Sequence, residues 1–160
     1  MQGYRYVMFA AATVAVAACN PFHRTRAVEI KSAEVPVSSR WNATLATPTQ
    51  LAGALQVQGS AWMAPGSDNQ TLVYVSVMNA APGGQHPWHV HLGTCGNDQG
   101  ILGPADAYKS LKIDGDGKAS QQITLPVPIP TTGQYHVNVH ASSSNMGTII
   151  ACGNLAPPLD

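Results

Sequence analysis

Charged residues are scarce in this sequence: Lys and Arg contribute 8 of its 160 residues, Asp and Glu another 8, and the formal net charge is zero. A chain without a basic face or basic run has no electrostatic means of holding nucleic acid, so that class of partner is excluded. The apolar run at residues 7–18 is twelve residues long, whereas a membrane-spanning helix needs about 20. No amphipathic helical pattern follows it, which argues against a helical fold.

The first 18 residues are typical of a lipoprotein signal peptide. Arg5 precedes the apolar run, which ends in Val16-Ala17-Ala18-Cys19, the small-residue pattern of a bacterial lipoprotein processing site. We therefore predict a lipid on Cys19, a tether over residues 19–39, and a lipid-anchored protein of the cell envelope, facing the periplasm or at the outer membrane. The alternative is an ordinary secretory signal with an incidental cysteine.

Cysteine is also rare, with three in the chain. If Cys19 carries lipid, Cys95 and Cys152 remain as an even pair. An even pair in an exported chain predicts a disulfide, because the bacterial periplasm is oxidising. Two free buried thiols are the alternative.

From residue 40 onward the sequence has an all-β pattern. Short runs rich in Val, Thr, Tyr and Leu alternate with clusters of Gly, Pro, Asn and Asp. The clearest run, 71–78, places Val73, Val75 and Val77 on one face. The predicted strands are 41–45, 54–63, 71–78, 86–92, 111–113, 119–125, 135–140 and 148–152. We predict one domain over residues 40–160, an immunoglobulin-like Greek-key β-sandwich or flattened barrel of about eight antiparallel strands, with an irregular loop over 95–108.

Five of the six histidines fall in two of these predicted strands. Residues i and i+2 of a strand share a face, so His89 and His91 point the same way, with Val90 turned to the core. His140 likewise shares a face with Asn138 and His136. If the strands are neighbours, His89, His91 and His140 converge, and imidazole ligands suit copper or zinc. Taken alone, the pattern is more typical of solvated or hydrogen-bonded strand histidines than of a metal site.

The order of these motifs resembles the copper/zinc superoxide dismutase family. His86-Pro87-Trp88-His89-Val90-His91 is similar to the family segment His-Gly-Phe-His-Val-His, and Gly93-Thr94-Cys95 follows it. Asn138-Val139-His140 and Ala151-Cys152-Gly153 are similar to the family's later copper strand and its Ala-Cys-Gly. The resemblance extends over residues 41–155.

The resemblance implies a role for each matching residue. His89, His91 and His140 would bind one copper ion and carry catalysis, and His86 would hydrogen-bond nearby and fix the adjacent loop. Cys95 and Cys152 would form the disulfide. Trp88 would occupy an aromatic core position.

The sequence also departs from the family. No histidine lies between Cys95 and Tyr135, so the histidine that bridges copper and zinc and the zinc histidine ligands are missing, and we do not expect a zinc site. Ile149 stands where the family has an anion-attracting Arg, and residues 141–151 contain no Lys or Arg. We expect His136 to be an exposed strand histidine, and Met146 is a candidate soft ligand near the site.

Three functions are consistent with these features. The first is a copper-only superoxide dismutase outside the cytoplasm, whose partner is superoxide. The second is a module of the same fold that holds or passes copper ions. The third is a structural β-domain without metal. In each case the membrane is reached through the lipid on Cys19.

Overall fold

The computed structural model describes residues 36–158. The predicted signal peptide, the lipid site at Cys19 and most of the predicted tether lie outside these residues and stay predictions. Within the described part, no helix has the length and apolar character needed to cross a membrane.

The described chain is almost entirely β-structure, which confirms the predicted fold class. Eight strands form one antiparallel sheet in the order β6-β5-β9-β10-β1-β2-β3-β8, and β4 pairs with β7 in a two-stranded ladder. The strands are β1 (Trp41–Ala46), β2 (Gln58–Pro65), β3 (Thr71–Met78), β4 (Gln85–His86), β5 (Trp88–Thr94), β6 (Asn97–Ile101), β7 (Leu111–Lys112), β8 (Ala119–Leu125), β9 (Tyr135–Ser142) and β10 (Asn145–Leu155). Two 3₁₀ turns, η1 (Val37–Ser39) and η2 (Ala105–Ala107), complete the described elements.

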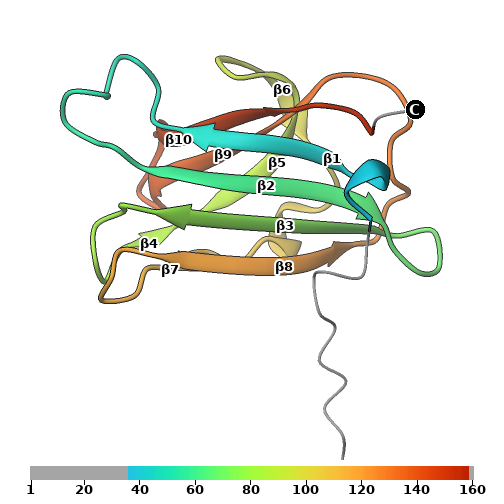
Figure 1. Ribbon diagram of the computed structural model, residues 1–160, viewed down its shortest axis with the longest axis horizontal. Coiled ribbons are helices and arrows are strands. Elements are labelled where there is room, and N and C mark those ends of the chain that lie inside the picture. Colours follow the sequence, from blue (N-terminus) through green and yellow to red (C-terminus); the bar gives the residue numbers. More distant parts are fainter. Residues whose placement is uncertain (1–35, 159–160) are drawn as a thin grey trace, which may run out of the picture. The chain divides into compact units, whose positions relative to one another are not determined.

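The sheet curls so that its two halves enclose the hydrophobic core. In Figure 1, β5 and β9 lie behind β1, β2, β3 and β8. Alternation along the strands supplies the core: in β3, Val73, Val75 and Val77 are buried whereas Tyr74 and Ser76 are half-buried, as predicted. The largest fully buried side chains come from both halves: Leu45, Met63, Val73, Val75, Trp88, Val90, Leu125, Val137 and Val139.

The region predicted as an irregular loop contains a strand. β6 pairs with β5, with Gly93 opposite Asp98. All but the last of its residues are exposed, so it has no hydrophobic alternation that would reveal it in the sequence. Gly96, with φ of 83°, allows the tight turn that folds β6 back onto β5.

The predicted strands 111–113 and 119–125 are not paired with each other. A turn follows the first of them at Asp114, whose carboxylate accepts hydrogen bonds from the backbone N–H groups of Asp116 and Lys118. However, β7 pairs with β4 rather than with β8, with Leu111 opposite His86. Because β4 leads into β5 and β7 precedes β8, this short ladder links the two halves of the large sheet beside the histidine-bearing strands.

Candidate metal centre

The histidines come together because β5 and β9 are antiparallel neighbours. Their register places His89 opposite Asn138 and His91 opposite His136. Val90 on β5 is fully buried in the core, as are Val137 and Val139 on β9. The strand period of two therefore puts the histidines on the opposite face of the same two strands.

His89, His91 and His140 form a compact cluster. One nitrogen from each ring lies within 4.8 Å of the others, and all three residues are buried. His89 Nδ1 and His140 Nε2 are only 3.3 Å apart. The structure thus brings together the three residues that the sequence selected, in an arrangement that can hold a metal ion.

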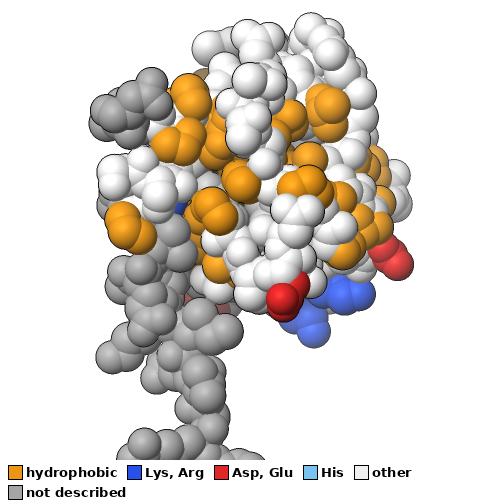
Figure 2. Space-filling view, turned by 90° about the vertical axis from the view of Figure 1, so that its right-hand side faces the viewer, with side chains coloured by type: hydrophobic (Ala, Val, Ile, Leu, Met, Phe, Trp, Pro, Cys, Tyr) orange, Lys and Arg blue, Asp and Glu red, His pale blue; other side chains and the backbone are white. Residues whose placement is uncertain are grey.

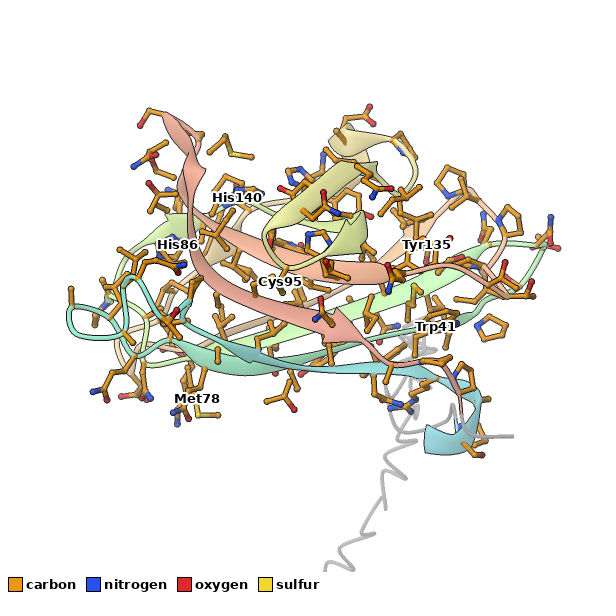
Figure 3. The ribbon with its side chains drawn as sticks, turned by 90° about the horizontal axis from the view of Figure 1, so that it is seen from above. Trp41, Met78, His86, Cys95, Tyr135 and His140 are labelled. Carbon is orange, nitrogen blue, oxygen red and sulfur yellow. A yellow bond between two sulfur atoms is a disulfide. The ribbon has the colours of Figure 1, made fainter. Side chains whose placement is uncertain are left out.

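Backbone contacts orient His140. Its Nδ1 donates a hydrogen bond to the Met146 carbonyl at 2.6 Å, which leaves Nε2 directed at the cluster. His86 Nδ1 donates to the carbonyls of His140 (3.1 Å) and Ala141 (2.9 Å). Figure 3 shows His86 and His140 close together at one end of the sheet, with Trp41 and Tyr135 at the other. His86 therefore supports the strand end that carries His140. The Met146 side chain is 37% exposed.

The cluster favours neutral imidazoles. Burial, with smaller contributions from the neighbouring His140 and His91, lowers the pKa of His89 to about 4. Burial also lowers the pKa of His91 and His140, although the Asp98 carboxylate opposes both shifts. Because a metal binds the neutral imidazole, the site is ready for a cation near neutral pH without losing protons.

His136 is buried, so the expectation that it is exposed is wrong. Its accessible surface is 0%, and Nε2 lies 2.5 Å from Asp98 Oδ1. The amide of Asn138 donates to both oxygens of the same carboxylate, at 3.0 and 3.2 Å. The His136 ring stacks on His91 with centroids 5.3 Å apart and an interplanar angle of 24°. His136 is buried because β6 carries Asp98 over this face of the sheet.

Asp98 and Asn138 are site residues that the sequence analysis did not select. Asn138 shares a strand face with His136 and His140, so period-two alternation was a signal for its position. For Asp98 the only signal was a carboxylate three residues after Cys95. Its approach to His136 depends on the pairing of β6 with β5.

The disulfide between Cys95 and Cys152 is present, as predicted, with Cα atoms 6.0 Å apart. It joins the end of β5 to β10, and the Cys95 N–H donates to Asn154 Oδ1 at 2.8 Å. The bridge therefore anchors the turn between β5 and β6, from which Asp98 reaches His136.

A groove of about 570 Å³ lies beside Asn138, which binds the Asp98 carboxylate. Asn138, Ile149 and the disulfide contribute to its walls, and no charged side chain lines it among the described residues. Ile149 is opposite His140 in the β9–β10 register. On the face of the molecule that Figure 2 shows, hydrophobic side chains are spread widely, and the few visible Lys, Arg, Asp and Glu side chains lie mainly toward its lower right.

The three converging histidines fit a metal ion by their position and also because His91 has ring nitrogens without a hydrogen-bond partner. Neither ring nitrogen of the buried His91 has a hydrogen-bond partner of normal geometry, although an interaction with the Gly100 backbone acts to raise the pKa of the ring. A buried nitrogen without a partner is unfavourable unless something else binds it. Three imidazoles are a donor set that suits copper and zinc.

No protein-family model matches the sequence, and no curated protein matches it. Among solved structures, the chain is similar to a SOD-like protein from Bacillus subtilis, with a TM-score of 0.53 and 16% identity over 71% of this chain and 97% of that one. A double mutant of a SOD-like protein from Bacillus subtilis aligns with a TM-score of 0.50 and 17% identity, over 72% of this chain and 96% of that one. Likeness at this identity concerns the fold. The domain therefore has the fold of SOD-like proteins, with three histidines on it that can hold a metal ion.

Proposed function

We propose that this domain binds one copper ion through His89, His91 and His140. The observation that carries the proposal is the convergence of three buried imidazoles, one nitrogen of each within 4.8 Å of the others. Sites built from nitrogen ligands bind Cu²⁺ more tightly than Zn²⁺, and imidazole is a good ligand for copper. The order of the histidines, which resembles that of copper/zinc superoxide dismutases, favours the same metal.

The surrounding residues would keep the ligands in place for such an ion. The Met146 carbonyl holds the His140 ring through Nδ1, and His86 holds the backbone on which His140 sits. Burial keeps all three rings neutral, so that protons compete weakly with a metal. Bound copper would supply one-electron redox chemistry.

Holding or passing copper is the function that the electrostatics favour over dismutation. Superoxide is an anion, and a positive surface accelerates the arrival of such a substrate by about 10–10³-fold. Here Ile149 stands in the groove wall, and the charged group that acts on His91 and His140 is the Asp98 carboxylate. This negative charge attracts a copper cation and repels superoxide. Dismutation remains the second candidate because the fold is SOD-like.

The test is a copper titration of the full chain, purified in detergent and stripped of metal. Binding of one equivalent that is lost in His140→Ala supports the proposal. Gln122→Ala, on β8, serves as the matched control and should bind like the unsubstituted protein. Copper binding that is unchanged in His140→Ala contradicts the proposed site.

The same samples decide between the two candidate functions. We expect superoxide turnover no higher than that of an equal concentration of free copper. Turnover well above free copper that disappears in His140→Ala would instead establish a dismutase.

We further propose that the domain is displayed in the cell envelope on a lipid attached to Cys19. The support is the apolar run 7–18, which ends in Val16-Ala17-Ala18 directly before Cys19. In bacterial cells fed labelled fatty acid, the chain should take up label and Cys19→Ser should not. Equal labelling of both proteins would contradict the anchor.

A further inference from the structure

His91 differs from the other two histidines in how its ring is held. His140 is oriented by a hydrogen bond to a carbonyl, and His89 Nδ1 lies against His140. His91 has no hydrogen bond of normal geometry at either nitrogen among the described contacts. The ring instead stacks on His136, with centroids 5.3 Å apart. The His91 ring also meets the rings of His89 and His140 edge-on, so among the described contacts His136 is its one stacked neighbour.

His136 in turn is held by a carboxylate. Its Nε2 contacts Asp98 Oδ1, and the Asn138 amide binds the same carboxylate. His136 is fully buried whereas the Asp98 side chain is 44% exposed. The contact thus joins a buried ring to a partly exposed carboxylate. Asp98 is itself placed by the β5–β6 pairing, opposite Gly93.

We propose that Asp98 and His136 are a positioning pair for His91, an inference that rests on the proposed copper site. Histidine ligands usually have their second nitrogen fixed by a carboxylate, carbonyl or water. In this domain the carboxylate fixes a second histidine, and that ring fixes the ligand by stacking. The Asp98 charge also lies close enough to affect His91, so it stabilises a cation bound there.

The pair explains why His136 is buried next to the cluster although it is not one of the three converging ligands. A second ring stacked on His91 limits rotation about the bonds of the His91 side chain. Limiting that rotation lowers the entropy lost when the ring binds a metal, which raises affinity.

Two substitutions separate the parts of the pair. Asp98→Asn removes the charge and keeps the shape at a partly exposed position, so the fold should tolerate it. His136→Phe keeps an aromatic ring against His91 but breaks the link to Asp98. Asp106→Asn, in η2, removes one carboxylate outside the cluster and is the matched control.

The readouts are Cu²⁺ affinity, by competition with a chelator, and the Cu²⁺ electron paramagnetic resonance spectrum of the full chain. We expect affinity to fall about 10-fold in Asp98→Asn and in His136→Phe, as for other partners of metal ligands. The copper hyperfine splitting should change in both, because the orientation of His91 changes. Asp106→Asn should match the unsubstituted protein in both measurements.

A merely structural role would give a different result. If Asp98→Asn lowers the urea midpoint but leaves affinity within twofold and the spectrum unchanged, the inference is overturned while the copper site stands. If the unsubstituted protein shows no His140-dependent binding, the proposed function fails and the inference fails with it. If His136→Phe does not fold, Asp98→Asn alone tests whether the pair positions His91.

Discussion

Replacing both Cys95 and Cys152 with alanine should lower the free energy of unfolding by about 4 kcal/mol. The bridge joins residues 57 positions apart. For a loop of that size, the chain-entropy model assigns ~4 kcal/mol at 25 °C to the restriction of the unfolded chain. A loss of this size is a large part of the roughly 5–15 kcal/mol that stabilises an ordinary domain.

Urea unfolding followed by tryptophan fluorescence measures this loss, since Trp88 is fully buried and reports on the core. The dependence of the unfolding free energy on urea should also become steeper, because the unbridged chain exposes more surface when it unfolds. Copper binding should persist at reduced stability, because the ladder between β5 and β9 positions the histidines without the bridge.

Reductant provides the internal control for this prediction. It should destabilise the unsubstituted protein by about the same ~4 kcal/mol and leave the double-alanine variant unaffected. A loss below about 1 kcal/mol in that variant would refute the entropic reasoning. A variant that reductant still destabilises would show that the effect does not come from the bridge.

Three further predictions follow from the site and the core. The metal-free protein should lose stability as the pH falls from about 6.5 toward 4, because the folded pKa of His89 is lowered to about 4 and the unfolded chain takes up the proton first. Urea midpoints at pH 7.5 and 4.5 measure this loss, and a higher midpoint at pH 4.5 would contradict the prediction. Trp88→Ala should lower the free energy of unfolding in urea by about 3–5 kcal/mol. The ring is fully buried, and its Nε1 donates to the Lys109 carbonyl and Gln121 Oε1, both at 2.9 Å. A loss under about 1 kcal/mol would show that the core closes over the cavity left by the ring. His86→Ala should weaken Cu²⁺ binding about 10-fold in a chelator competition, since two carbonyls at the end of β9 lose their hydrogen-bond donor. Unchanged affinity would show that His86 does not support the copper site.

Local alternation in the sequence predicts much of this fold, because a strand has a period of two wherever it lies. The valines of β3 are buried as the alternation predicts. His89 and His91 share a face for the same reason, with Val90 in the core. The pairing of Cys95 with Cys152 could be predicted because counting cysteines left one pair.

The surroundings of the histidines depended on tertiary structure. β6 has no apolar alternation, so its existence is decided by its partner β5 and not by its own residues. Once β6 is paired, Asp98 meets His136, and a histidine that looked exposed becomes fully buried. The residues of one strand specify its faces, but which side chains from elsewhere cover a face depends on strand order and register. Strand period and motif order therefore predicted His89, His91 and His140 from the sequence, whereas only the long-range pairing of the folded chain showed that Asp98 and His136 lie beside His91.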